Sequence, residues 1–310
     1  MLIGIDVGGT NLVAAKVSDS GKILDKASIP VNRFASAEEL CADIVRLART
    51  VAKEDRIEAV GIGFPGLVDN NLGVVIQTPN MPFCNTPFRE LFQKEWNIPV
   101  FMGNDANCAA IGEYWAGAAK DRHIAVMITL GTGIGGGLIV NGKLFAGSFN
   151  GGMEVGHMVI DPTGPICGCG RKGCFEQYAS ATALIRIAKE QMIGCKNSLL
   201  WHYCDGNIEG VQGITVFQAA QDGDPTAHKV LDVYIDYLAI GLANLINILQ
   251  PEVICLGGGI SNAQDDLFLI PLQERVKKYV FDKNAPLCIE RATLGNDAGL
   301  VGAAMLCKSV

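Results

Sequence analysis

Two glycine-rich turns, each set between strand-like hydrophobic runs, constrain the fold of this chain more than any other feature. The first turn is Gly8-Gly9-Thr10, and the second is the stretch 131–137, which is followed by the hairpin dipeptide Asn141-Gly142. The hydrophobic runs span residues 2–7, 12–17 and 23–29 around the first turn, and 124–130 and 138–140 around the second. Such runs bounded by glycine turns are typical of β-strands. The sequence therefore predicts one β-meander that occurs twice.

Helix signals follow each predicted meander, so the expected fold class is α/β. Ser36 followed by Glu39 forms a capping box ahead of apolar residues with helical spacing. Further helices are predicted at about residues 87–96, 226–249 and 298–306, and further strands at 60–62, 99–102 and 253–256.

The length of 310 residues exceeds the usual size of one hydrophobic core, and this favours two lobes. Hydrophobic residues make up 49% of the chain and charged residues 18%, which excludes a disordered protein. We expect an N-terminal lobe over residues 1–117 and a C-terminal lobe over residues 118–297. A last helix, at about residues 298–310, is expected to pack back on the first lobe. Two lobes imply a central cleft.

Charge and hydrophobicity exclude several classes of partner. The net charge of −7, without a basic run, argues against nucleic acid. The longest apolar stretch, 238–249, is too short to span a membrane and contains Asn244 and Asn247. The chain opens at Met1 with a strand-like run and no secretion signal, so we expect a cytoplasmic protein. Eight of the eleven cysteines are scattered singly, as buried free thiols would be.

The glycine turns have a chemical interpretation beside the structural one. Asp6 ends the first predicted strand and Thr10 ends the first turn, so backbone N–H groups there can bind phosphate oxygens while the carboxylate holds Mg²⁺ through water. Glycine turns between strands are also common without a ligand. The five glycines of residues 131–137 favour close backbone approach to a polyphosphate. No Walker or dinucleotide-binding spacing is present, and the turn at residues 257–261 is a candidate to pack on adenosine.

Asp105 lies between a predicted strand and an alanine-rich helix, within Asn104-Asp105-Ala106-Asn107. Its position alone favours a carboxylate that caps the helix. The other interpretation is a cleft residue that accepts a proton from a hydroxyl during phosphoryl transfer.

A cysteine and histidine cluster is the densest signal in the chain. Its members are His157, Cys167, Cys169 and Cys174, with glycines between them. Three thiolates and one imidazole fill a tetrahedral zinc shell and leave no open position, so a zinc ion here is expected to be structural. Glu154 and Glu176 flank the cluster, either as solvated surface residues or as acceptors for sugar hydroxyls.

Together these motifs resemble the ROK family of sugar kinases and sugar-responsive repressors over nearly the whole chain. The most specific element is Glu-x-Gly-His followed by Cys-x-Cys-Gly-x-x-Gly-Cys-x-Glu, within residues 154–176. The resemblance implies a two-lobed actin/hexokinase-like (ribonuclease H-like) fold. It also implies in-line transfer of the γ-phosphoryl group of Mg-ATP to a hexose hydroxyl, O6 by expectation, with Asp105 as general base rather than helix cap.

The same resemblance implies the remaining site residues. The sugar-binding residues are Gly66, Asn80, Asn104, Asp105, Glu154, His157 and Glu176. The nucleotide-binding residues are Asp6, Gly8, Gly9, Thr10, Asn11, Gly131, Thr132, Gly133, Gly257 and Gly258. The structural zinc is implied on His157, Cys167, Cys169 and Cys174. Homodimers are common in this family.

Residues 104–117 and 178–182 are most similar to those of bacterial glucokinases, so glucose is the expected sugar. Kinases for N-acetylmannosamine, fructose and allose use nearly the same motifs and stay as alternatives. Met153 departs from the small residue that the family usually carries there. The alternative from another class is a non-catalytic, sugar-responsive regulator. Regulators of the family carry a helix-turn-helix domain ahead of the lobes, and we expect no such domain ahead of Met1.

Overall fold

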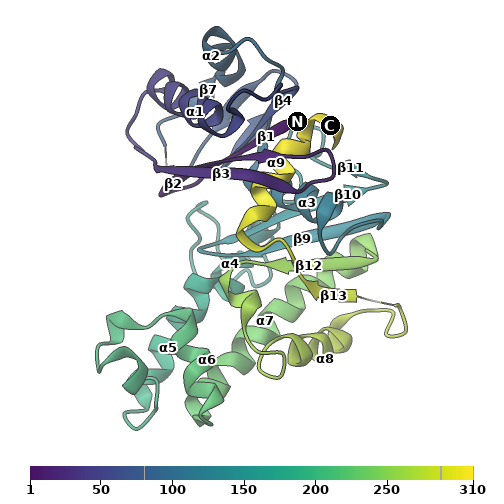
Figure 1. The fold of residues 1–310 in the computed structure, drawn as a ribbon. Coiled ribbons are helices and arrows are strands. Elements are labelled where there is room, and N and C mark those ends of the chain that lie inside the picture. Colours follow the sequence, from purple (N-terminus) through teal and green to yellow (C-terminus); the bar gives the residue numbers. More distant parts are fainter. Residues whose placement is uncertain (80, 287, 310) are drawn as a thin grey trace. The chain divides into compact units, whose positions relative to one another are not determined.

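The computed structural model describes residues 1–79, 81–286 and 288–309, and the chain divides into two compact units (Figure 1). The first unit contains residues 1–127, 137–153 and 292–310, and the second contains residues 128–136 and 154–291. The lobe limits expected from the sequence, 1–117 and 118–297, divide the chain differently and stay a prediction, as does the cleft between lobes.

The first unit is built on a five-stranded mixed sheet. Its strands are β1 (Leu2–Val7), β2 (Asn11–Val17), β3 (Ile23–Pro30), β4 (Ala59–Phe64) and β8 (Val100–Asn104), in the order β3-β2-β1-β4-β8. The first three strands form the predicted antiparallel meander, and β4 and β8 lie parallel to β1. Because parallel strands end at the same edge, the last residues of β1 and β8 lie at one edge of the sheet.

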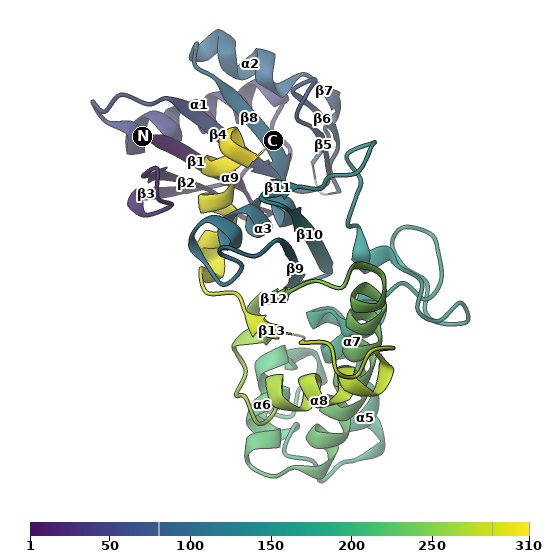
Figure 2. The same ribbon diagram turned by 90° about the vertical axis from the view of Figure 1, so that its right-hand side faces the viewer.

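Helices cover this sheet. They are α1 (Ala37–Ala52), α2 (Phe88–Glu95), α3 (Asp105–Ala116) and α9 (Ala298–Ser309). The capping box of Ser36 and Glu39 starts α1, as predicted. Helix α9 lies directly on the sheet, where a side chain at Gly4 or Gly61 would collide with its backbone. In both ribbon views the last helix crosses the first unit, although it comes from the far end of the sequence (Figures 1 and 2).

A small second sheet of the first unit was not predicted. It consists of β5 (Leu67–Asp69), β6 (Val74–Gln77) and β7 (Cys84–Thr86). These strands are only three or four residues long, so they lack the periodic pattern that sequence analysis requires.

The other five-stranded sheet repeats the strand order of the first. Its strands are β9 (Ile124–Leu130), β10 (Ile134–Val140), β11 (Lys143–Leu144), β12 (Val253–Gly257) and β13 (Cys288–Arg291), in the order β11-β10-β9-β12-β13. Consecutive strands again form the meander, and β12 again lies between the meander and the last strand. This confirms the α/β fold with a duplicated meander.

The prediction that residues 131–137 form one glycine loop is wrong. Only residues 131–133 lie in the turn, because β10 already begins at Ile134. Gly137 lies within β10, where a Cβ atom would come within 2.6 Å of Ala110 on α3. Part of the glycine content therefore serves the close packing of a helix on the strand. The predicted hairpin turn is confirmed: Asn141 and Gly142 both have positive φ angles, of 50° and 80°.

Helices make up most of the second unit. They are α4 (Glu176–Ala179), α5 (Ala181–Gly194), α6 (Gly213–Gln221), α7 (Pro225–Leu249) and α8 (Leu269–Tyr279). Asp224 caps α7, and Pro225 starts it. Within the described residues, α7 alone has the length and hydropathy of a candidate membrane span, but 56% of that stretch is buried among the other helices, as in a core helix.

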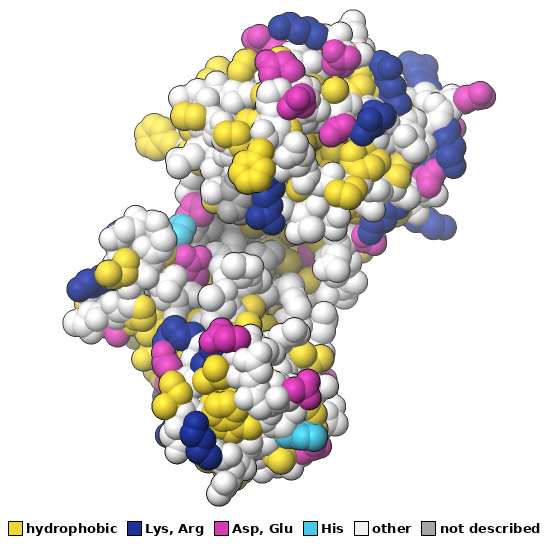
Figure 3. All heavy atoms as spheres, turned by 90° about the vertical axis from the view of Figure 1, so that its left-hand side faces the viewer, with side chains coloured by type: hydrophobic (Ala, Val, Ile, Leu, Met, Phe, Trp, Pro, Cys, Tyr) yellow, Lys and Arg dark blue, Asp and Glu magenta, His cyan; other side chains and the backbone are white. Residues whose placement is uncertain are grey.

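Charged side chains of both signs are interspersed on the face drawn in Figure 3.

Candidate functional site

The first glycine turn lies at the edge of the sheet where β1 ends. The Gly8 N–H donates to the Asn11 carbonyl over 3.0 Å, and Val31 N–H donates to the Thr10 carbonyl, so the turn is fixed at both sides. Arg33 donates from its guanidinium to the Gly9 carbonyl. An exposed cation therefore lies against the turn, and sequence analysis did not single it out.

Asp6 is the last residue but one of β1, beside this turn, and lies near the start of α9. Its carboxylate would be 3.8 Å from a Cβ atom at Gly299. Burial, and after it the negative charge of Asp105, raises the pKa of Asp6 to about 6, while Lys26 acts in the opposite direction. Two carboxylates that affect each other in this way form a site with affinity for a cation.

Asp6→Asn is expected to raise the free energy of unfolding of the ligand-free protein by about 1–3 kcal/mol at neutral pH. The folded-state pKa lies above the unfolded value, so the folded protein takes up a proton more readily and loses stability as the pH rises from about 4 to about 6. The gain should therefore be present at about pH 7.5 and small at about pH 4. Urea denaturation at both pH values measures it, with the exposed Asp266→Asn as control, and an equal gain at both pH values would contradict the assignment.

Asp105 is the first residue of α3, and Asn104 is the helix cap. The Asn104 Oδ1 atom accepts hydrogen bonds from the backbone N–H groups of Ala106 (2.9 Å) and Asn107 (3.1 Å), and its Nδ2 donates to the Gly66 carbonyl over 2.9 Å. Asn104 therefore caps the helix, although position alone favoured Asp105 as the cap. Asp105 remains exposed at the sheet edge where β1 and β8 both end.

Gly66 has a φ angle of 96°, and a side chain there would collide with the Gln77 carbonyl. Only glycine fits this turn without strain. Asn80, the other predicted sugar ligand of this region, lies outside the described residues.

The second glycine turn belongs to the second unit and borders a cavity of about 420 Å³. Ala181 N–H donates to the Gly131 carbonyl and the Thr182 hydroxyl to the Thr132 carbonyl, both over 2.8 Å, so the start of α5 holds the turn. The cavity walls also include Phe217 of α6 and Ile260. Sequence analysis missed the wall from α6, because its residues carry no motif.

The turn after β12 forms the remaining wall of this cavity. Gly258 has a φ angle of 93° and lies against the Leu130 carbonyl, so a side chain there would collide with the end of β9. Arg291, at the end of β13, donates to the carbonyl groups of Ser261 and Ala263 and pairs with Asp265. These contacts hold the predicted adenosine turn in place.

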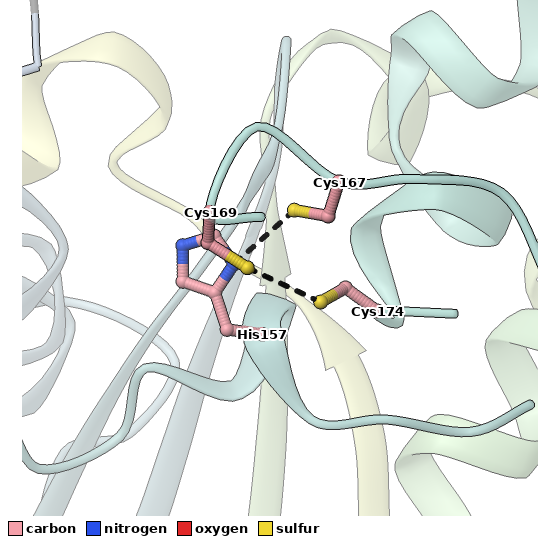
Figure 4. A group of neighbouring side chains, drawn as sticks. All are labelled: His157, Cys167, Cys169 and Cys174. Carbon is pink, nitrogen blue, oxygen red and sulfur yellow. Dashed lines mark hydrogen bonds between the residues drawn. The ribbon is translucent and has the colours of Figure 1, made fainter. Parts of the chain in front are cut away.

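The predicted metal cluster is assembled in the second unit (Figure 4). The ligand atoms of His157, Cys167, Cys169 and Cys174 all lie within 4.8 Å of one another. His157 is in a short 3₁₀ turn, and the three thiols surround it from one tight loop. That loop closes through hydrogen bonds between residues 167 and 171 and through Gly170 and Gly173, whose φ angles are positive.

The cluster fits zinc in donor type and in spacing. Cys167 Sγ lies 3.6 Å from His157 Nδ1, and Cys169 Sγ lies 3.6 Å from Cys174 Sγ. Tetrahedral zinc with Zn–S bonds of about 2.3 Å requires neighbouring ligand atoms about 3.5–3.8 Å apart. The hydrogen bond from Arg171 lowers the pKa of the Cys169 thiol to about 6, which favours the thiolate.

Glu176 connects the cluster with the second glycine turn. Its Oε1 accepts from the Cys167 thiol over 2.9 Å and lies 3.7 Å from His157 Nδ1, while its Oε2 would be 2.6 Å from a Cβ atom at Gly133. It is therefore a largely buried, positioned carboxylate rather than a solvated surface residue. Glu154, three residues before His157, is exposed.

Met153, the residue noted as unusual, has a φ angle of 65°. The left-handed region costs a residue that carries a Cβ atom about 1–2 kcal/mol, and only glycine avoids this cost.

Comparison with known proteins identifies the family of this chain. The model of the ROK family matches residues 2–310. A glucokinase of Thermotoga maritima is 40% identical, over 99% of this chain and 97% of its own length. A ROK family glucokinase from Streptomyces griseus, solved with glucose and AMPPNP, is 35% identical with a TM-score of 0.85 over 98% of both chains. A ROK family transcriptional regulator, a homologue of the E. coli MLC protein, is 26% identical with a TM-score of 0.88 over 99% of this chain and 77% of the regulator.

The fold is therefore the α/β fold of the ROK glucokinase structures. The chain belongs to the ROK family.

Proposed function

We propose that this protein is a glucokinase that transfers the γ-phosphoryl group of ATP to glucose, at O6. The observation that carries the proposal is the likeness to glucokinases over the full length of the chain, including one solved with glucose and an ATP analogue. A pair of carboxylates at one sheet edge and a cavity beside a second glycine turn supply the chemistry that this reaction needs.

Asp105 acts as the general base. A hydroxyl that attacks phosphorus must lose its proton as the new P–O bond forms, and a nearby carboxylate accepts it. Asn104 holds the start of α3 by its cap and holds the Gly66 turn by its amide, so it fixes the position from which Asp105 acts. The base is a positioned group on a rigid element.

Asp6 and the turn at residues 8–10, with Asn11, bind the phosphate end of ATP. Asp6 holds Mg²⁺ through water, and the ion neutralises phosphate charge when bound. Backbone N–H groups of the turn donate to phosphate oxygens, and Arg33 adds a cation beside Gly9.

In the second unit, the turn Gly131-Thr132-Gly133 binds the phosphates. The cavity of about 420 Å³ behind it receives the adenosine, with Gly257 and Gly258 at the end of β12. Its predominantly small and apolar lining is suited to a purine and ribose.

The sugar is held by Gly66, Asn80, Asn104, Glu154, His157 and Glu176, together with Asp105. Because His157 directs Nδ1 at the thiols, its Nε2 atom on the other side of the ring remains for a sugar hydroxyl (Figure 4). Zinc on the four cluster residues would fix the orientation of His157 and the position of Glu176.

Cys169→Ser is expected to lose the metal and, with it, sugar binding. The purified wild-type protein should contain about one zinc per chain. Removing one of four ligands opens the loop that positions His157 and Glu176, so glucose affinity should fall even where nucleotide binding remains. Elemental analysis and glucose titration measure both losses. Cys84→Ser, an exposed cysteine outside the cluster, is the control, and a Cys169→Ser protein that keeps its glucose affinity would contradict the proposed link.

A coupled ADP-release assay tests the function. Mg-ATP is offered with glucose, N-acetylmannosamine, N-acetylglucosamine, fructose, mannose and allose, and selective turnover of glucose is expected. Selective turnover of another sugar would keep the kinase and replace the substrate. If zinc-containing protein that binds sugar turns over none of these sugars, the regulator class would be favoured. The structural likeness to a ROK transcriptional regulator is the reason to test this class.

Family analogy supports a homodimer, and the net charge and the lack of a secretion signal support the cellular setting. We propose a cytoplasmic homodimer that binds neither membrane nor nucleic acid. Light scattering of the purified protein and its partition in fractionated cells measure these properties.

A further inference from the structure

Helix α4, which begins with the proposed sugar ligand Glu176, is too short to hold its own position. It contains only four residues, and helices of this length are unstable without outside contacts. The Phe175 N–H, just before the helix, donates to the Met158 carbonyl over 2.8 Å. At the other end, the Tyr234 hydroxyl donates to the Ala179 carbonyl over 2.8 Å. These contacts hold both ends of α4, and none of the functions above uses a further contact from the middle of the helix.

Tyr178 makes this further contact. Its hydroxyl donates to Asp161 Oδ2 over 2.9 Å, and the centre of its ring lies 4.4 Å from that of Tyr237 on α7. Tyr178 is only 6% exposed, so it is anchored in the interior of the second unit. Residues two apart in a helix point to different sides, so this anchor lies on the side of α4 away from Glu176. The anchored ring limits how far α4 can rotate, and it thereby fixes the direction of the Glu176 carboxylate.

Asp161, the acceptor of this hydrogen bond, is itself held in place. Its Oδ1 accepts from the Thr163 N–H over 2.9 Å and from the Thr163 hydroxyl over 2.7 Å. These hydrogen bonds lower the pKa of the Asp161 carboxyl, so it accepts as a carboxylate. Gly173, with a φ angle of 73°, lies so close that a side chain there would collide with the Asp161 carbonyl. Because Asp161 follows His157 by four residues, it joins the segment that carries His157 to the helix that carries Glu176.

We propose that Asp161 and Tyr178 are positioning residues for the sugar site. Their hydrogen bond sets the distance between the Glu176 carboxylate and the His157 ring, and neither residue of the pair touches the sugar. The inference rests on the proposed function, in which Glu176 and His157 bind the sugar. Ligands on one rigid frame lose less freedom when a sugar binds, so breaking the frame lowers sugar affinity. A hydrogen bond that only stabilises the fold would leave the sugar affinity of the folded protein unchanged.

Calorimetric titration of the full-length protein with glucose, without nucleotide, tests the inference together with steady-state kinetics. Tyr178→Phe keeps the buried ring and removes only the hydroxyl. It should raise the dissociation constant and the KM for glucose by about tenfold. The kcat and the KM for ATP should stay nearly unchanged, because the lost interaction concerns sugar binding rather than the chemical step. Asp161→Ala and the double variant should show the same loss as Tyr178→Phe, because the two residues act through one hydrogen bond.

Tyr203→Phe is the matched control. The Tyr203 hydroxyl also donates to a carboxylate, that of Asp222, and both residues lie in the second unit but outside the proposed sugar site. This variant loses the same type of hydrogen bond, so its glucose affinity should equal that of wild type. Elemental analysis of every variant should find the zinc content of wild type.

Each outcome decides the inference. A loss of glucose affinity in Tyr178→Phe, with zinc retained, supports it, and this variant decides alone if Asp161→Ala does not fold. Wild-type glucose affinity in Tyr178→Phe overturns the inference and leaves the proposed function standing. Loss of zinc together with affinity also overturns it, because the pair would then hold the metal cluster rather than Glu176. If wild type binds glucose without phosphorylating it, the proposed function fails, and the titration still decides the inference.

Discussion

Asp105→Asn is expected to lower kcat by about 10²–10⁴-fold and to leave glucose affinity nearly unchanged. The amide keeps the shape of the side chain and its place at the start of α3, but it cannot accept the proton of the attacking hydroxyl. The fall should therefore concern the chemical step rather than sugar binding. Single-turnover kinetics with Mg-ATP, beside a glucose titration without nucleotide, separate the two.

Two controls sharpen this test. Asp266→Asn, an exposed carboxylate of the second unit, should retain full activity. Asp105→Glu keeps the carboxylate but moves it by about one methylene, so its activity should lie between wild type and Asp105→Asn. Wild-type turnover in Asp105→Asn would remove Asp105 from the mechanism and restore the simpler view of it as a carboxylate at a helix start.

Glu113→Ala is expected to lower the free energy of unfolding by about 3–5 kcal/mol. Glu113 is fully buried in α3. Its carboxylate accepts from the backbone N–H groups of Ala118 (2.8 Å), Thr293 (3.0 Å) and Leu294 (2.8 Å), and from the Thr293 hydroxyl (3.2 Å). Truncation removes a fully buried acceptor and leaves the N–H groups of Ala118, Thr293 and Leu294 without their partner. Urea denaturation followed by circular dichroism measures the loss.

Glu113→Gln separates hydrogen bonding from packing in this prediction. It fills the same space but offers one acceptor oxygen and an NH₂ group that faces other donors, so it should lose less stability than Glu113→Ala and still clearly more than the exposed control Glu54→Ala. Equal stability of Glu113→Gln and wild type would mean that these hydrogen bonds contribute little.

The fold was predictable where the pattern is long or chemically distinct. The meander strands, the capping box of α1 and the helix at residues 226–249 follow from period and capping, which are local properties. The β5–β7 sheet was missed because its strands are too short to show a period. The stretch 131–137 was misassigned because glycine permits both a turn and a close approach, and only the position of α3 shows which applies at Gly137.

Sequence analysis predicted best which side chains cluster where these residues are close in sequence. His157 and the three thiols lie within 18 residues, so their spacing already indicated one cluster. Asn104 and Asp105 were both singled out. Which of the two caps the helix, and which has an exposed carboxylate, depends on backbone angles that the sequence does not show. Folding alone brings Arg33 to the first glycine turn and α6 to the cavity beside the second glycine turn.

Helix α9 has a consequence for how the protein is made. The first unit takes its central sheet from the start of the chain and its covering helix from the end. During synthesis, the face of the sheet around Gly4 and Gly61 therefore stays uncovered until α9 has been translated and has left the ribosome. A nascent chain stalled before residue 298 should present that apolar face to chaperones. Removal of α9 should first destabilise the sheet of the first unit, which is the part of the chain that is synthesised earliest.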